Sequence, residues 1–373
     1  MNSLHGLAWD HPRGVQGMLA STYPYAVQTG IRVEWTARSL KDFGDVPFEQ
    51  MAREYDLLVV DHPHMGYADA THCLHPLEMT LRAEIRRELA VQSAGASYPT
   101  YEYNGHQYAL PVDAAVHSTV YRADLLDAAL PDDWEGVIRL GAELRERGLW
   151  MAVPLVPTDA ISVFITLVAN LGAPVGADGQ MTDPQIGLRA LHLIREFHAV
   201  AHPQSHTWNP ITMLDQMTTA KDIAYCPLAY SYSNYARRGF AKYPLRFANI
   251  PGIRGAVLGG AGIAVSAFSK AIPEACAYAA WLCSADVQST LYVENGGQPG
   301  NGAAWLDENA NRITNNFFRD TLQTLESAYV RQRNPGWIGF QEGAGRLIHA
   351  MLRDHTDPQR CLAQMQTLYA ESV

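Results

Sequence analysis

The fold of this chain is decided by the stretch YDLLVVDHPH, residues 55–64. Residues 57–60 are four consecutive apolar side chains without alternation, which is typical of a short strand buried on both faces of a parallel sheet. Pro63 cannot donate to a sheet ladder, so the strand ends there, and a carboxylate and two imidazoles follow its carboxyl end. Ligands bind at this edge in open α/β sheets. Asp61 ahead of a proline is equally typical of a helix cap, and both interpretations stay open.

The first sixty residues predict a parallel β-α-β-α-β unit. Short apolar or alternating stretches indicate strands, and stretches with apolar residues at helical spacing separate them. Such units build parallel sheets through right-handed crossovers, with helices packed on the sheet. The expected strands are residues 4–9, 31–35 and 57–60, and the expected helices are residues 15–29 and 48–54.

The tripeptide Asp-His-Pro occurs twice, at residues 10–12 and 61–63, each time directly after an expected strand. Parallel strands joined by crossovers have their carboxyl ends at one edge of the sheet, so we expect the two tripeptides to share a site there. Capping of two separate helices explains each tripeptide as well, and this alternative stays open. The residues expected at the shared edge are Asp10, His11, Arg38, Asp61, His62 and His64.

Aromatic side chains are further candidates for ligand contact, because a tyrosine or tryptophan combines a large apolar face with a polar tip. Tyr230 and Tyr232 follow the end of an expected strand, residues 223–228, in a loop rich in serine and asparagine. Trp9 ends the first expected strand, and Trp337 is a candidate of the same kind. We expect most of the other tyrosines to pack in the core or lie at the surface.

Composition and charge restrict the class of protein. A length of 373 residues predicts two domains, and 47% hydrophobic with 18% charged residues is typical of a globular protein. The net charge of −10 argues against nucleic acid or an anionic membrane surface as a partner. The chain has no run of about 18 apolar residues, so we expect no membrane insertion.

The start of the chain leaves two locations open. Met1 is followed almost at once by the first expected strand, and no secretory leader precedes it. We expect a periplasmic or extracellular protein if a leader was removed, and a cytoplasmic protein if Met1 is the native start.

The sequence predicts neither a metal nor a cofactor. His62 and His64 form a His-x-His pair of the kind found in some zinc and iron sites, but Pro63 interrupts it and no carboxylate at helical spacing completes a ligand set. We find no nucleophile elbow, phosphate loop, dinucleotide fingerprint or HExxH motif. The glycine-rich GGAG at residues 259–262 precedes a strand rather than a helix, which favours a hinge over a phosphate cradle.

Three groups of motifs follow one another along most of the chain. They are DLLVV (56–60) with LHPL (74–77), then GHQYALP (105–111) with VYRADLL (120–126) and PDDWE (131–135), and last LGGAGIAVS (258–266) with GGQP (296–299). In their order and spacing they resemble the extracellular solute-binding proteins of ABC importers, the maltose-binding-like group. The two Asp-His-Pro tripeptides depart from the sugar-binding pattern of that group and, with Arg38 nearby, favour an anionic organic ligand.

The resemblance implies an α/β protein with a two-lobe, periplasmic-binding-protein-like fold and a central cleft. It implies chain crossings near residues 111–114 and 258–263, with a third crossing further on, and a small-molecule ligand between the lobes. Asp113, Gly260 and Gly262 lie at these crossings and join the expected ligand-binding residues. Lobe one would comprise residues 1–111 and 262–306, and lobe two residues 112–261 and 307–373.

Two functions are consistent with these features. The first is a solute-binding protein that closes its lobes over a small polar, anionic ligand and works with the membrane component of an ABC importer. The second is a cytosolic enzyme on the same scaffold, in which Asp10, His11, Asp61 and His62 perform acid/base chemistry on a small carboxylate or related substrate. The absence of a catalytic motif favours binding. If the imidazoles face an anion, its affinity should rise as the pH falls from about 8 to about 5.

Overall fold

Strand β3 (Leu57–Val60) lies where the sequence predicts it, and all four of its side chains are buried. In the computed structural model, which describes residues 3–39 and 48–373, β3 pairs in parallel with β1 (Ser3–Trp9). On its other side it pairs antiparallel with β10 (Leu258–Val265). The strand is therefore central, as its apolar run predicts, but the sheet around it is mixed rather than purely parallel.

The predicted β-α-β-α-β unit is confirmed. Strand β1 pairs in parallel with β2 (Arg32–Arg38) as well as with β3, and the chain between them forms α1 (Pro12–Thr29) and α3 (Phe48–Glu54). Alternate side chains of β3 belong to two different hydrophobic cores, one shared with α1 and the other with α3 and α4 (Met65–Thr71). The helices that follow β1 and β3 therefore cover opposite faces of the sheet.

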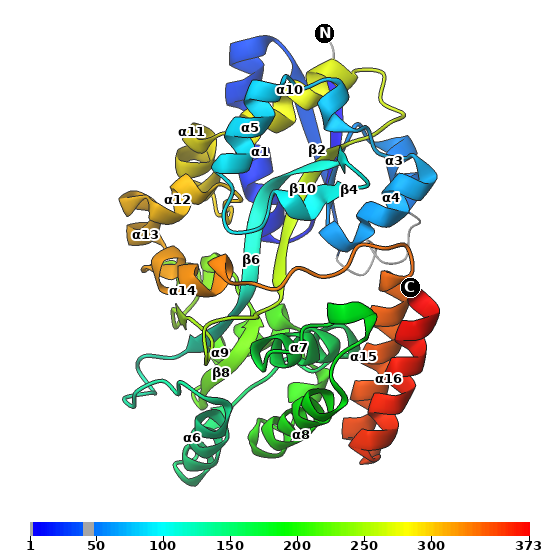
Figure 1. Ribbon diagram of the computed structural model, residues 1–373. Coiled ribbons are helices and arrows are strands. Elements are labelled where there is room, and N and C mark those ends of the chain that lie inside the picture. The colour runs from blue at the N-terminus through cyan, green and yellow to red at the C-terminus, as the bar shows by residue number, and fades with distance from the viewer. Residues whose placement is uncertain (1–2, 40–47) are drawn as a thin grey trace.

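Two long strands join the halves of the molecule. The sheet order is β2-β1-β3-β10-β6-β8-β7, with β9 paired to β6. Strand β6 (Ala109–Tyr121) pairs with β10 along its first part and, from His117 onward, with β8 (Ile223–Tyr230). In Figure 1, β6 and β10 run from the upper body of the molecule into the lower one. This is the two-lobe α/β fold that the sequence predicts.

A third connection crosses between the lobes without regular structure. We call residues 328–336 the strap; it leads from α14 to α15 and is drawn in orange across the middle of Figure 1. Tyr329 forms a bridge with Val257 beside β10, and the carbonyl of Arg333 accepts a hydrogen bond of 2.9 Å from the amide of Gly66 in α4. The strap thus contacts both lobes.

The remaining elements surround this framework. On the side of β1–β3 they are η1 (His62–His64), η2 (Leu77–Met79), α5 (Ala83–Val91), η3 (Pro99–Tyr101), the hairpin β4 (Glu102–Tyr103) and β5 (His106–Gln107), α10 (Ile272–Leu282), α11 (Ala285–Val287) and η7 (Gln288–Tyr292). The others are α6 (Trp134–Glu146), β7 (Trp150–Met151), α7 (Pro157–Asn170), η4 (Ala177–Gly179), α8 (Pro184–Val200), η5 (Ser205–Thr207), α9 (Pro210–Thr219), η6 (Ser233–Ala236), β9 (Arg246–Ala248), α12 (Gly302–Leu306), α13 (Glu308–Ile313), α14 (Phe317–Glu326), α15 (Trp337–Asp354) and α16 (Pro358–Ser372). No helix in the described part of the chain is both long and apolar enough to span a bilayer.

The glycine-rich run lies inside β10 and shapes its backbone. Gly260 has φ of +97°, a left-handed conformation that glycine adopts without strain, and a Cβ there would collide with the Asp113 carbonyl. The pairing of β10 with β6 shifts register between Ala261 and Gly262, and the Tyr101 ring packs on Gly262. Gly260 and Gly262 are predicted as ligand residues; in the structure they allow β10 to pack closely on β6 and on the Tyr101 ring.

Candidate functional site

The first Asp-His-Pro tripeptide begins α1, and its histidine is the cap. The Nδ1 atom of His11 accepts a hydrogen bond of 3.0 Å from the amide of Arg13, while Pro12 occupies the first turn and Asp10 is exposed. Burial, together with the nearby Arg13 guanidinium, lowers the pKa of His11 to about 4. The capping interpretation therefore describes this segment, with His11 rather than Asp10 as the capping residue.

A network of hydrogen bonds around Arg13 joins α1 to the crossing strands. The Nε atom of Arg13 donates to Asp113 Oδ2 at 2.8 Å, and its Nη2 donates to Oδ1 of the same carboxylate. Its Nη1 donates to the carbonyl of Ser231, just beyond β8, at 2.8 Å. The Tyr232 ring centroid lies 4.5 Å from the guanidinium carbon of Arg13, and the rings of Tyr232 and His11 meet edge to face at 4.9 Å.

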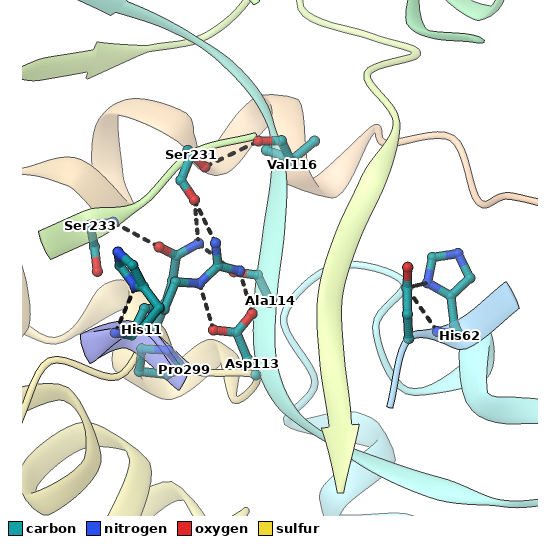
Figure 2. A network of polar contacts seen from close by, with 12 residues as sticks. His11, His62, Asp113, Ala114, Val116, Ser231, Ser233 and Pro299 are labelled. Atoms are coloured by element: carbon teal, nitrogen blue, oxygen red, sulfur yellow. Dashed lines mark hydrogen bonds and ion pairs between the residues drawn. The ribbon is translucent and has the colours of Figure 1, made fainter. Parts of the chain in front are cut away.

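Gln298 completes this network. Its Nε2 donates to the Ala114 carbonyl at 2.8 Å, and its Oε1 accepts from the amide of Ser233 at 2.8 Å. The Ser231 hydroxyl donates to the Val116 carbonyl at 3.1 Å. We call Arg13, Asp113, Ser231 and Gln298 the Arg13 hub; Figure 2 shows Asp113 and Ser231 of this hub beside β6. Every polar side-chain atom of these four residues has a partner.

The second tripeptide begins η1, and here the aspartate is the cap. Asp61 Oδ1 accepts from the amide of His62 at 2.9 Å, and both carboxylate oxygens lie 2.8 Å from Nη2 of Arg331 in the strap. Burial opposes ionisation of Asp61, but the Arg331 guanidinium outweighs it and lowers the pKa of this carboxyl well below its usual value. Asp61 therefore ties η1 to the strap.

His62 is fully buried, and neither of its ring nitrogens has a hydrogen-bond partner. Its Nδ1 lies 3.3 Å from Asp61 Oδ1, close enough for an ion pair when the ring is protonated. Burial, with the nearby Arg331 charge, lowers the pKa of His62 to about 4, so this ring is neutral at neutral pH. Buried nitrogens without partners are costly, because nothing replaces the water that they lose on folding.

Similar atoms without partners lie on β6, at the end of β8, in the strap and at the start of α15. They are the Nε2 of His117, the hydroxyl of Tyr230, the Nε of Arg331 itself and the indole nitrogen of Trp337. Arg331 interacts electrostatically with His62, His117 and Tyr230. We call His62, His117, Tyr230, Arg331 and Trp337 the unpaired group.

Each lobe and the strap contribute to the unpaired group. Tyr230 ends β8; its ring packs on Gly259 of β10 and lies 4.5 Å from the ring of His117 on β6. Trp337 is the first residue of α15, directly after the strap, and α15 contacts η1, where His62 lies. Burial, with the charge of Arg331, lowers the pKa of His117 to about 3, so this imidazole is neutral as well.

Asp159 is a buried carboxylate that the sequence interpretation passed over. It lies in the first turn of α7, has 5% of its surface exposed, and makes no hydrogen bond or ion pair with the described residues. It interacts electrostatically with Tyr230 and Tyr232. Burial raises the pKa of Asp159 to about 7. A single carboxylate at the start of an apolar helix was the only signal in the sequence, and it is also typical of a helix N-terminus.

Three other predicted residues, His64, Arg38 and Trp9, are in contact with other side chains or backbone of the chain. The ring of His64 stacks on Phe48, with centroids 5.6 Å apart. The Arg38 guanidinium donates to Glu54 at 3.2 Å and to the Tyr55 hydroxyl at 3.3 Å, so its charge is already engaged.

Trp9 belongs to the hydrophobic core, and its indole packs on Gly14 in α1. Its ring is therefore a packing element of the first lobe.

The structure does not bring the two tripeptides together. Figure 2 shows His11, with Asp113 and Ser231, on one side of the pair formed by β6 and β10, and His62 on the other side. The reason is topological: the chain turns from β1 and β3 toward opposite faces of the sheet. The strand ends share an edge, as predicted, but the side chains beyond them diverge. An enzyme that needs His11 and His62 in one acid/base cluster has no such cluster here.

Two surface hollows lie away from these residues. One of about 380 Å³ is lined by residues of α6, α8 and α15, and another of about 610 Å³ by residues of β6, β9 and α14. Neither is lined by the Arg13 hub or by the unpaired group. Within residues 3–39 and 48–373, no three His, Cys, Asp or Glu side chains converge in a way that could hold a metal ion.

The fold and the junction between its lobes define a class of two-lobed binding proteins. The chain belongs to the family of bacterial extracellular solute-binding proteins, whose family model matches residues 24–311. Among curated proteins, no relative matches it significantly.

Solved structures of ABC-transporter binding proteins share the fold over the whole chain. Maltose-bound MalE3 of T. maritima has a TM-score of 0.86 at 17% identity, with 100% of both chains covered. A solute-binding protein from Thermotoga lettingae TMO with bound α-D-tagatose has a TM-score of 0.82 at 16% identity, covering 100% of this chain and 99% of its own. One from Agrobacterium vitis S4 with bound D-mannitol has 0.76 at 16%, covering 100% and 98%. At these identities the similarity shows the fold alone.

Proposed function

We propose that this solute-binding protein closes its lobes over a small, neutral, hydroxyl-rich ligand held by the unpaired group and Asp159. The observation that carries the proposal is the set of buried polar atoms without partners where η1, β8, the strap and α15 meet. Native proteins pair nearly all their buried polar atoms, so a local concentration of exceptions calls for a missing partner. A ligand bound between the lobes would be that partner.

The chemistry of the unpaired atoms favours hydroxyl groups. The nitrogens of Arg331 and Trp337 can only donate a hydrogen bond, whereas an ionised Asp159 can only accept one. A hydroxyl both donates and accepts, so a sugar or polyol can serve all of these groups at once. The related structures named above contain maltose, α-D-tagatose and D-mannitol.

The charges at the junction do not support the anionic ligand that the sequence suggested. Asp61 balances Arg331, and the pKa values of His62 and His117, lowered mainly by burial, leave both rings neutral. Arg38 is bound to Glu54. Asp159, the remaining buried acidic group, brings no positive charge that could hold an anion.

Cell location and partner follow from the family and belong to the proposal. We infer a periplasmic or extracellular protein that delivers its ligand to the membrane component of an ABC importer. The lobes in this proposal are residues 1–111 with 262–306, and residues 112–261 with 307–373.

Calorimetric titration with maltose, D-tagatose, ribitol, D-mannitol and, as an anion, succinate tests the proposal. We expect at least one sugar or polyol to bind, and succinate not to bind. Tyr230→Ala should weaken binding about tenfold or more, because a buried aromatic anchor is lost, whereas Tyr23→Ala, at an exposed position of α1, should not. Scattering should show a smaller radius of gyration with ligand. Equal loss in both variants, or binding of succinate alone, would contradict the proposal.

A further inference from the structure

Asp159 differs from the other charged groups at the junction because nothing compensates it. Asp61 and Asp113 are also in contact with the crossing segments, but each is paired with an arginine. Asp159 has 5% of its surface exposed and no partner among the described residues. An uncompensated buried charge is expensive, so in the ligand-free protein the carboxyl favours its protonated form.

Two groups interact electrostatically with Asp159: Tyr230, which ends β8, and Tyr232, just after it. Beyond them, His117 on β6 lies against the Tyr230 ring, and Arg331 of the strap is in electrostatic contact with Tyr230. From α15, which packs on α7, His349 donates from Nδ1 to the Leu155 carbonyl at 2.9 Å, just ahead of α7. Arg331 carries the full positive charge in this set, and Asp61 already neutralises it. No protein group is therefore available to stabilise the carboxylate.

We propose that solute binding displaces a proton from Asp159, so that uptake of the ligand and release of a proton are coupled. This inference rests on the proposed function. In the free protein the carboxylic acid is neutral; a ligand hydroxyl then donates its hydrogen bond to the carboxylate, and the acid proton leaves to solvent. The ligand keeps its own proton, no covalent bond to it forms or breaks, and one proton is released for each ligand bound.

The direction of the coupling follows from the two protonation states. Because burial raises the pKa of Asp159 to about 7 in the free protein, binding below that pH must first remove a proton. A hydrogen bond donated by the ligand favours the charged form and lowers the pKa in the complex. Affinity should therefore rise by up to about tenfold per pH unit between about pH 5 and 7, and level off above about pH 8. This is opposite to the pH dependence that imidazoles holding an anion would produce.

Calorimetry on the best-binding sugar or polyol of the panel tests the coupling. Titrations near pH 6 in two buffers with different heats of ionisation count the protons released, and titrations from about pH 5.5 to 8 give the affinity profile. We expect release of close to one proton and a rising profile for the parent, and no release and a flat profile for Asp159→Asn. Asp286→Asn, at an exposed first-turn position of α11, should behave as the parent does.

The outcomes separate the two proposals. If no sugar or polyol binds at any pH, the proposed function fails and the coupling fails with it. If one binds with a flat profile and no proton release in the parent, only the coupling is overturned. A profile that is unaltered in Asp159→Asn overturns it as well.

A second measurement needs no ligand. The pKa of Asp159, raised by burial in the folded protein, lies above that of an unfolded aspartate, so its contribution to stability is fully present below about pH 4 and is lost as the pH rises through about 7. The asparagine variant mimics the neutral acid, so it does not lose this contribution to stability as the pH rises. In urea unfolding, the advantage of Asp159→Asn over the parent should grow from about pH 4 to 7 and then level off. A constant difference would overturn the inference.

Discussion

Two buried polar groups beside the strand pair β6–β10 differ in how completely their own members are hydrogen-bonded, although Ser233 Oγ and the Tyr292 hydroxyl, next to the first of them, also lack partners. On one side the Arg13 hub is buried and complete, with each of its polar side-chain atoms bonded. On the other side the unpaired group is also buried, yet its polar atoms lack partners. Both networks link the same strands to the rest of the molecule. In the function proposed above, the hub is a structural joint of the lobes and the unpaired group receives the ligand.

This contrast has an energetic counterpart. A satisfied buried network stabilises the fold, whereas each buried polar atom without a partner costs about 1–3 kcal/mol. Proteins retain such costs mainly where function requires them. Substitutions should therefore lower stability in the hub, and raise stability but lower affinity in the unpaired group.

The largest effect is expected in the hub. Arg13→Met would leave the buried Asp113 carboxylate without its partner, and we expect the free energy of unfolding to fall by about 3–5 kcal/mol. Urea unfolding at neutral pH measures this loss. Adding Asp113→Leu to Arg13→Met removes the orphaned charge and should recover most of the stability. A loss below about 1 kcal/mol in the single variant would show that the hub is not the joint described here.

The pH dependence of stability tests the unpaired group. The pKa of His62, lowered to about 4 mainly by burial, lies below the value of about 6.5 in an unfolded chain. The unfolded chain therefore takes up the proton first as the pH falls, and stability is lost between about pH 6.5 and 4. His62→Leu should remove roughly 2 kcal/mol of that loss at about pH 4.5, and should also stabilise the protein at pH 7 while weakening binding.

Urea unfolding at several pH values gives the change in stability, and calorimetry gives the change in affinity. His192→Leu is the control, because His192 is exposed in the middle of α8. Equal pH profiles for His62→Leu and the parent would mean that the His62 nitrogens are not deprived of partners.

The smallest effect is expected at Arg38. Its ion pair with Glu54 is partly exposed, so Arg38→Gln should change stability by less than about 1 kcal/mol. It should also leave the affinity for a sugar or polyol within about twofold, because the neutral ligand proposed here does not need this charge. A loss of affinity of about tenfold would restore the anion-binding hypothesis and weaken the contrast between the two sides.

Local patterns predicted the framework better than the site. The apolar run in β3, with its proline stop, marks a central strand, and β1, β2 and β3 pair in parallel as expected. The long β6 was harder to foresee, because Asp113 and His117 are polar residues inside a strand whose burial depends on chain segments far away in sequence. Local periodicity does not report such contacts.

His62, Tyr230 and Trp337 of the proposed site were candidates from the sequence, and the two tripeptides show why the rest of it was not predicted. Strand ends can be placed at a common edge from topology alone, but the direction of the side chains depends on which face the next helix covers. Arg331 lies in a strap without periodicity, and Asp159 resembles an ordinary helix start. Their importance appears only when the missing hydrogen-bond partners are counted in three dimensions.

The pairing of β3 with β10 also affects how the chain is made. During synthesis β3 emerges early, whereas its neighbour β10, residues 258–265, leaves the ribosome only after most of the chain has been made. Until then one edge of a wholly apolar strand has no partner, and such edges are sites of aggregation. The first lobe therefore cannot finish its sheet while the nascent chain is short. Slow, late folding of this kind leaves a long interval in which a chaperone can hold the chain unfolded.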